Sequence, residues 1–305
     1  MLAFTLKRLV LAVVVAVTVS VLAFLLLRIS GDAAIALAGE GARAEDIDNI
    51  RHLYGLDRPI MVQYFDLLGK MLRGDFGFSL YFHSNVTALI FDKLPTTLWL
   101  AVLSLLFALA ISLPLGVLAA TRPNSWVDRL CLLLAVCGQA MPNFFFALVL
   151  IMVCAVTLQV LPVSGSDTWA HFVLPTITLG YYVAPPFMRL VRAGMIEVLA
   201  SDYIRTARAN GLSGSNIILK HALRNALVPV VALTVVQLGI LLGGSVVIET
   251  VFALDGLGYL AYQSIAHHDL PVTQAVVTLV SFIYVGLTLA ADLLNAWLDP
   301  RIRVG

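Results

Sequence analysis

Long runs of apolar residues constrain this chain most, because about 20 apolar residues in a helix cross a bilayer core of roughly 30 Å. The first run extends from Leu9 to Leu27, directly after Lys7 and Arg8. Hydrophobic residues make up 60% of the 305 residues and charged residues only 12%. Soluble proteins contain roughly 25% charged residues. The sequence therefore predicts an all-α polytopic membrane protein.

Five further apolar runs follow, and we expect each to span the membrane as a helix. They extend over about 97–120, 129–160, 171–190 and 229–248, and from Pro271 to about Trp297. Pro142 should kink or break the third of these six spans, because proline lacks the N–H and its ring clashes with the preceding turn. A cleaved signal peptide ending near Ala36-Leu37-Ala38 is the alternative for the first span. Its apolar run is longer than the usual 7–15 or so residues, which favours an uncleaved anchor.

The longest polar region, residues 30–96, separates the N-terminal tail and first span (1–29) from the remaining core (97–305). Ile47, Ile50 and Leu53 recur at helical spacing and Gly55 can stop that helix. A second helix is expected from about Pro59 to Gly74. We therefore predict a helical cap between the first two spans.

The distribution of basic residues predicts the orientation, because lysine and arginine in short loops favour the cytoplasmic side. Most of the 19 lysine and arginine residues lie in segments on the side of the N-terminus, among them Lys7, Arg8, Arg205 and Arg208. The others fall in or beside the cap. Six spans then place both termini in the cytoplasm and the cap outside.

A polar insert, residues 191–228, is the one sustained interruption on the cytoplasmic side. Ser201 or Asp202 can cap a helix that Gly211 stops, and Ser213 or Ser215 can cap a second helix from Asn216 to about Asn225. We expect Tyr203, Ala207 and Asn210 to share one face of the first helix. From the pattern alone, docking in a partner's groove and lying on anionic lipid are equally compatible with this insert.

The insert resembles the EAA loop of binding-protein-dependent ABC importer permeases. Ala207, Gly211, Ile217, Leu227 and Pro229 match positions of that loop, whereas Thr206 replaces its glutamate, as is typical of the peptide-transport branch. Further segments resemble the first permease subunit of dipeptide, oligopeptide and glutathione importers: 53–59, 74–79, 94–98, 174–179, 242–249 and 300–303. Ser30-Gly-Asp-Ala33 departs from that family, which has proline at both ends of this motif.

This resemblance implies the type I importer permease fold in a bacterial inner membrane. It implies coupling to an ATPase through eight residues: Tyr203, Arg205, Thr206, Ala207, Arg208, Asn210, Gly211 and Leu212. The implied partners are a second homologous permease chain, two cytoplasmic ATPase subunits, an extracytoplasmic solute-binding protein and membrane lipid. The binding protein is expected to dock on the cap around Tyr54, Asp57, Asp75 and Tyr81.

The implied substrate is a dipeptide or oligopeptide, with nickel chelates, glutathione and opine-like solutes as alternatives. A secondary transporter is the rival from another class, but no internal repeat is visible in the sequence. We expect no enzymatic activity, because the sequence contains no Gly-x-x-x-x-Gly-Lys-Ser/Thr motif, and ATP and Mg²⁺ would be bound by separate ATPase chains. The net charge of +1 gives no indication of nucleic-acid binding.

Several residues in or near the spans have two possible roles. The translocation-path candidates are Gln139, Asn143, Gln237 and Ser245, which could instead bond between helices. Gly239, Gly243 and Gly244 are expected to allow close helix packing. Asp292 and Asn295 could be functional, but lie near a span end, where reaching water is the expected role. His267-His268-Asp269 is expected to be a solvated loop and not a metal site, and Cys131, Cys137 and Cys154 to be reduced thiols.

Overall fold

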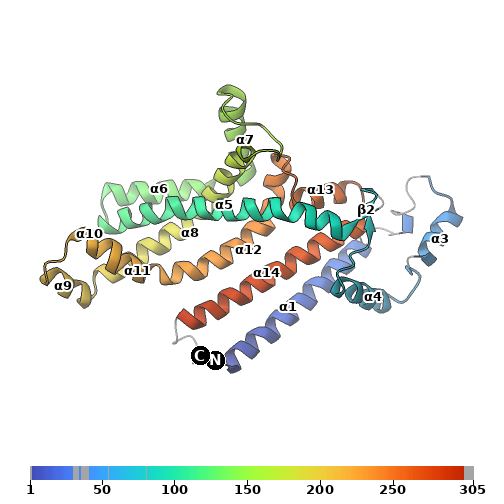
Figure 1. Cartoon of the computed structure of the whole chain (residues 1–305), viewed down its shortest axis with the longest axis horizontal. Helices are drawn as coiled ribbons and strands as arrows, with labels where there is room; N and C mark the ends of the chain where they lie inside the picture. Colours follow the sequence, from blue (N-terminus) through green and yellow to red (C-terminus); the bar gives the residue numbers. More distant parts are fainter. Residues whose placement is uncertain (1, 30–33, 36–40, 54, 80, 299–305) are drawn as a thin grey trace.

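The computed structural model describes residues 2–29, 34–35, 41–53, 55–79 and 81–298, and helices dominate it. Long helices lie lengthwise side by side in a bundle (Figure 1). They are α1 (Leu2–Ile29), α5 (Val86–Thr121), α6 (Trp126–Ala140), α8 (Val173–Leu199), α12 (Val228–Val251) and α14 (Leu270–Leu298). The expected all-α class is confirmed, apart from a two-stranded antiparallel hairpin of β1 (Phe78–Ser79) and β2 (Ser84–Asn85).

Four helical segments in the described part of the chain are long and apolar enough to cross a membrane: Thr5–Leu26, Val86–Thr121, Val228–Val251 and Leu270–Trp297. A fifth span results if α6 is joined to α7 (Asn143–Leu150) and the π-helix η1 (Ile151–Thr157). These two parts meet at 99°. The break lies at Met141-Pro142, as expected from the missing proline N–H.

Helix α8, the expected fourth span, is not among these apolar candidates. Its sequence contains Arg189 and Arg192 in addition to several prolines and tyrosines. However, α8 lies inside the bundle, where it packs against α5, α6 and α12. A helix that its neighbours shield from lipid does not need an apolar surface on every side, which explains why composition alone does not identify it.

Two boundaries differ from the prediction. Helix α5 begins at Val86 and not near residue 97, because Asn85 caps it by accepting a hydrogen bond from the Thr87 N–H at 2.8 Å. Pro95 lies inside this helix without ending it. The expected polar turn 249–271 instead contains helix α13 (Leu257–Ala266), whose Leu257 and Leu260 are buried against α5 and α14.

The two helices predicted in the cap are present. They are α3 (Ala44–Leu53) and α4 (Ile60–Leu72), and the glycines expected to stop them have positive φ angles, +63° at Gly55 and +77° at Gly74. Helix α4 lies against α1, where the Tyr64 hydroxyl is 2.6 Å from Ser20 Oγ. Tyr54, Ser30-Gly-Asp-Ala33 and Pro300 to Arg303 lie outside the described residues.

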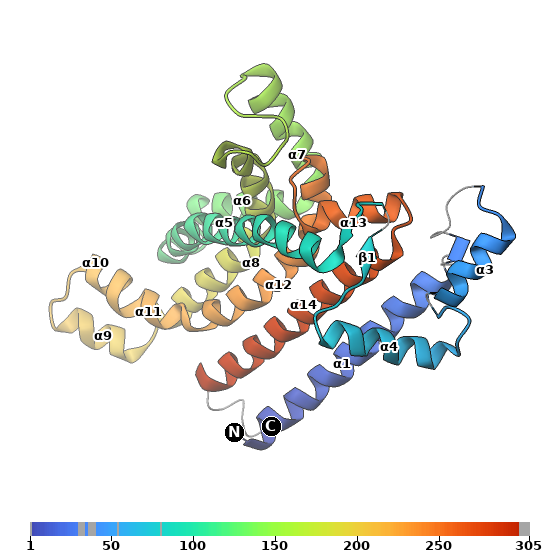
Figure 2. The same ribbon diagram turned by 45° about the vertical axis from the view of Figure 1, so that its right-hand side comes forward.

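The bundle has two distinct ends (Figure 1). One end carries the polar insert and the turn between α5 and α6, and there the start of α1 lies near the end of α14. The hairpin, α3, α4 and α13 lie toward the opposite end, which both views show (Figures 1 and 2). The predicted cap and the predicted coupling insert are therefore on opposite ends of the molecule.

Candidate coupling site

The polar insert folds as a helix, a glycine turn and a second helical stretch that projects from one end of the bundle (Figure 2). Its elements are α9 (Asp202–Ala209), α10 (Gly214–Asn216), the π-helix η3 (Ile217–Ala222) and α11 (Leu223–Ala226). Gly211 has a φ of +77°, as the predicted left-handed stop requires. Ser213 Oγ accepts a hydrogen bond from the Asn216 N–H at 3.4 Å, so the predicted second cap is also present.

Apolar contacts hold this insert on the bundle. Ile204 of α9 and Ile217 of η3 are buried and belong to the main core, together with Met195 at the end of α8. Asn225 Nδ2 donates a hydrogen bond to the Tyr203 hydroxyl at 2.7 Å, which joins the two helical stretches across the turn. The insert therefore has a defined position between α8 and α12.

The exposed surface of the insert is mainly polar. Seven of the eight predicted coupling residues are exposed, and Ala207 is half-buried against the core. Of the three residues expected to share one face, Tyr203 and Asn210 are exposed and Ala207 is half-buried against the core. Ile204, the one large aliphatic residue of α9, is buried in protein, so α9 has no aliphatic face to insert into lipid. This geometry favours a protein partner.

An ion pair joins α8 to α6 near the end of α8 that leads to α9. The Arg192 guanidinium donates two hydrogen bonds to the Asp128 carboxylate, at 2.6 and 2.7 Å. Only 3% of the Asp128 side chain is exposed, and this carboxylate also accepts from the Asn124 N–H at 2.9 Å. Our sequence reasoning missed this pair. The signal that could have revealed it is a single aspartate at the start of an otherwise apolar run.

A second buried carboxylate lies near the opposite end of α12. Glu249 accepts hydrogen bonds from Thr97 Oγ1 at 2.9 Å and from the N–H groups of Gly258 and Tyr259 at 2.7 and 3.1 Å. Thr97 Oγ1 in turn accepts from the Leu257 N–H at 2.8 Å. These bonds satisfy N–H groups at the start of α13 that have no partner within the helix, so Glu249 and Thr97 hold the start of α13 against α12 and α5.

The four translocation-path candidates have different surroundings. Gln237 and Ser245 are buried within the chain. Gln139 accepts a hydrogen bond from Arg189 at 3.3 Å, and Asn143 Oδ1 accepts from the Phe144 N–H at 2.8 Å. Both hydrogen bonds are made within this chain. The role of all four residues in transport stays a prediction.

Of the three glycines on α12 that were expected to allow close packing, one lies against a neighbouring helix of this chain. A Cβ on Gly239 would lie 3.0 Å from the Tyr284 ring of α14, so this glycine does allow close packing. Gly243 and Gly244 face open space, with no atom within 4 Å of an added Cβ. Packing at these two positions within the described chain is therefore ruled out.

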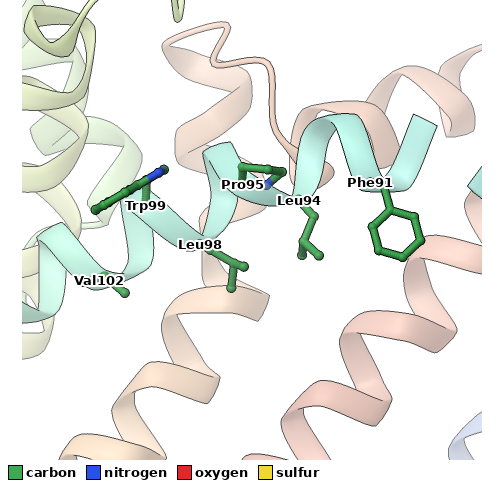
Figure 3. A pocket seen from close by; sticks show the side chains of 6 residues that line it. All are labelled: Phe91, Leu94, Pro95, Leu98, Trp99 and Val102. Carbon is green, nitrogen blue, oxygen red and sulfur yellow. The ribbon is translucent and has the colours of Figure 1, made fainter. Parts of the chain in front are cut away.

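An apolar groove of about 370 Å³ lies along α5 (Figure 3). All its lining residues come from that helix: Phe91, Leu94, Pro95, Leu98, Trp99 and Val102. None of the translocation-path candidates contributes to it. Since no lining side chain is charged, the groove is suited to an apolar neighbour.

Three residues near helix ends are in contacts that differ from expectation. Asp292 forms an ion pair with Arg8 of α1 at 2.9 Å instead of reaching water alone. Asp269 is buried and accepts hydrogen bonds from Ser79 Oγ and the Val272 N–H, so it does not lie in a solvated loop. His267 stacks on Tyr81 with ring centroids 3.9 Å apart. Within the described part of the chain, no group of three or more potential metal ligands is present.

The predicted docking residues are spread over the far end of the molecule. Asp57 contacts His52 Nδ1 at 2.9 Å, and Asp75 Oδ1 accepts from the Gly77 N–H at 3.0 Å. Tyr81 is 47% exposed, although its ring stacks on His267. The docking role of these three residues stays a prediction.

Comparison with known proteins supplies the family. Residues 112–304 match the family described as "Binding-protein-dependent transport system inner membrane component", and residues 1–101 match its N-terminal counterpart. The chain is 40% identical to the glutathione transport system permease protein GsiC of Escherichia coli K12 over 304 residues, covering 99% of both chains. It is 41% identical to the Salmonella typhimurium LT2 protein of the same name, again covering 99% of both chains.

A solved structure shares the fold. The MetNI methionine ABC transporter in an inward-facing conformation aligns with a TM-score of 0.58 at 24% identity, covering 69% of this chain and 96% of that chain. The fold, the polar insert and the full-length relatives agree with one another. The chain therefore belongs to the binding-protein-dependent transport system inner membrane components, and it is a permease subunit of an ABC importer.

Proposed function

We propose that this permease imports small peptides or a peptide-like solute such as glutathione, as one of two permease chains driven by two separate ATPase subunits. The named glutathione permeases at 40–41% identity support this substrate class. The absence of a P-loop motif from the sequence supports separate ATPase chains.

The observation that best supports the coupling role is the packing of the polar insert on the bundle. Its buried residues Ile204 and Ile217 belong to the bundle core, while its polar residues are exposed. A displacement of α9 by an ATPase would therefore pass through these contacts to α8 and α12. The Asp128–Arg192 pair would extend that movement from α8 to α6.

The topology that fits this role has six spans, with the buried helix α8 as the span that composition misses. Both termini and the insert would be cytoplasmic, in a bacterial inner membrane. Support comes from the basic residues at that end and from the opposite location of the hairpin, α3 and α4. The binding protein would then dock at the outer end, around Asp57, Asp75 and Tyr81.

The second permease chain would cover apolar surface that this chain leaves open. Gly243 and Gly244 are exposed on α12, and small residues allow the close approach of a helix from another chain. The groove along α5 is a second uncovered surface (Figure 3). Both surfaces would lie at or near the shared transport path.

Replacing Gly211 with valine tests the coupling role. A β-branched residue at a φ of +77° strains the turn by roughly 1–2 kcal/mol, so α9 should be displaced. In the reconstituted importer with its binding protein, we expect transport and stimulated ATPase activity to fall about tenfold while the ATPases still co-purify. Gly214→Ala is the control, because Gly214 has open space and lacks the positive φ. Unchanged stimulation in Gly211→Val would refute the assignment.

Uptake into vesicles tests the substrate class. ATP-dependent accumulation of glutathione or a dipeptide, in the presence of the matching binding protein, is the expected result. Transport of only a nickel chelate or an opine-like solute would contradict the peptide-like class. Uptake by this chain alone on an ion gradient would contradict ATP-driven import.

A further inference from the structure

Helix α4 has three chemically different faces. Tyr64, Leu67 and Met71 are spaced by three and four residues and are buried or half-buried. Met61, Phe65 and Leu72 lie on a second face and are 67%, 65% and 77% exposed. Gln63, Asp66 and Lys70 lie on a third face, roughly opposite the second at 100° per residue, the rotation of an α-helix. The helix therefore leaves an apolar face uncovered while it already packs through another.

The packed face locates α4 relative to the first span. Tyr64 contacts Ser20 of α1 through the 2.6 Å hydrogen bond, and its ring lies 5.6 Å from the Phe24 ring, edge to face. Ser20 and Phe24 both lie inside the apolar segment Thr5–Leu26. Figure 2 shows α4 lying across this part of α1. Helix α4 thus lies at the depth of the outer part of the span and not above it.

The polar face is anchored away from the exposed apolar face. Gln63 Nε2 donates hydrogen bonds to the carbonyl oxygens of Leu56 and Arg58 at 3.0 and 2.7 Å. Arg58 also donates to Asp66 at 3.2 Å. These contacts fix the rotation of α4 about its axis. They direct Met61 and Phe65 to the side opposite Gln63 and Asp66.

Apolar side chains of α1 at the level of α4 are exposed as well. Leu22 and Leu26 of α1 are 51% and 65% exposed, next to the level of Ser20 and Phe24, where α4 packs. Burying a side chain such as phenylalanine or leucine is worth about 1.5–3 kcal/mol, so three such side chains left in water would oppose this position of α4. A helix with one apolar and one opposed polar face is suited to lie in the plane of a membrane interface.

We propose that α4 is an interfacial helix, with Met61, Phe65 and Leu72 among phospholipid acyl chains and Asp66 and Lys70 directed to headgroups and water. Its place in the outer leaflet rests on the proposed topology. The polar region between the first two spans then has two functions. Helix α4 fixes α1 in the bilayer, and surfaces other than its apolar face remain for the binding protein.

Spin-label accessibility in the intact importer, reconstituted in phosphatidylethanolamine–phosphatidylglycerol liposomes, tests this proposal. Phe65→Cys and Asp66→Cys form a matched adjacent pair, with Met61→Cys and Lys70→Cys as a second pair, in a chain whose Cys131, Cys137 and Cys154 are replaced by alanine and which retains uptake. The label at residues 65 and 61 should collide with oxygen severalfold more often, relative to a water-soluble nickel chelate, than the label at 66 and 70.

Equal collision ratios within each pair would overturn the interfacial position. A label at residue 65 that meets the nickel chelate freely, and is shielded only when loaded binding protein is added, would show that this face is a protein contact and would also overturn it. Labelling of Lys70→Cys in spheroplasts by an impermeant maleimide tests the side separately. Reaction from outside supports a location of α4 in the outer leaflet. Reaction only after permeabilisation would contradict that location and the proposed topology, but it would leave the depth of α4 in the membrane unaffected.

Discussion

Helix α8 with its neighbour α5 and helix α1 with its neighbour α14 are assembled by different means. Backbones of α5 and α8 approach closely: a Cβ on Gly180 would lie 2.6 Å from the Ser104 carbonyl oxygen, and one on Gly116 would lie 2.8 Å from Val191 Cβ. In the second pair, Gly286 of α14 has nothing within 4 Å of an added Cβ. Many α1 side chains, such as Val13 and Val14, are exposed.

This difference indicates that the two helix pairs have different roles. Close backbone packing through small residues is the usual means of joining helices in a membrane, where the hydrophobic effect contributes little. The α5–α8 pair and the attached coupling insert thus form the part that can transmit movement. The α1–α14 pair faces lipid, and two polar contacts of α1, Arg8–Asp292 and Ser20–Tyr64, position it.

The largest expected effect comes from breaking the ion pair on α8. Asp128→Asn leaves the largely buried Arg192 without its counter-charge, which costs about 3 kcal/mol or more. Thermal unfolding of the purified complex in detergent should show a large decrease in the midpoint. The double variant Asp128→Leu/Arg192→Met should regain part of the loss. Additive losses in the double variant would contradict the coupling of these two residues.

The second-largest effect is expected where the backbones of α5 and α8 pack closely. Gly180→Ala places a methyl group against a backbone oxygen that cannot rotate away, which should cost about 1–3 kcal/mol and lower the yield of assembled complex. Gly286→Ala is the matched control on α14 and should be neutral or slightly stabilising, since alanine favours helix by about 1 kcal/mol. Equal effects of both variants would remove the contrast between the two helix pairs.

The hydrogen bond inside the coupling insert should have a smaller effect on stability. Tyr203→Phe removes the hydroxyl that accepts from Asn225, which costs about 0.5–1.5 kcal/mol. We expect faster hydrogen exchange in α9 and a moderate decrease in stimulated ATPase activity, with assembly retained. Thr206→Ala is the control for hydrogen exchange, because the Thr206 hydroxyl donates to the backbone of its own helix. Unchanged exchange in Tyr203→Phe would show that the bond does not position α9.

The smallest effect is expected at the ion pair between α1 and α14. The Arg8 and Asp292 side chains are 40% and 27% exposed, so the pair should contribute about 1 kcal/mol or less. Asp292→Asn should change the unfolding midpoint little. A loss as large as that of Asp128→Asn would show that α1 is as integral to the fold as α8.

Local features of the fold were predictable from the sequence because they depend on neighbouring residues. Gly55, Gly74 and Gly211 end helices as expected, since each adopts a positive φ. Pro142 breaks the third apolar run for the same local reason. The two helices and the glycine turn of the polar insert were predicted in this way, whereas its coupling role was implied by the resemblance and stays a prediction.

The contacts that could not be predicted join distant segments. Asp128 and Arg192 are 64 positions apart, and Thr97 and Glu249 are 152 apart. The packing of Ala207 of α9 depends on a core surface that only folding creates. Gly243 and Gly244 were expected to allow close helix packing, and in the described chain no atom lies within 4 Å of a Cβ added to either.

The sequence by itself determined the class of protein, the ends of many helices and the polar insert with its resemblance to a coupling loop, because composition, capping and turn residues act locally. Only the tertiary structure decided that α8 lies inside the bundle, that two buried carboxylates fasten helices together and that α4 lies beside the first span. These features depend on which helix faces meet. The helical periodicity of a sequence predicts which face is apolar, but it does not predict which helix packs against that face.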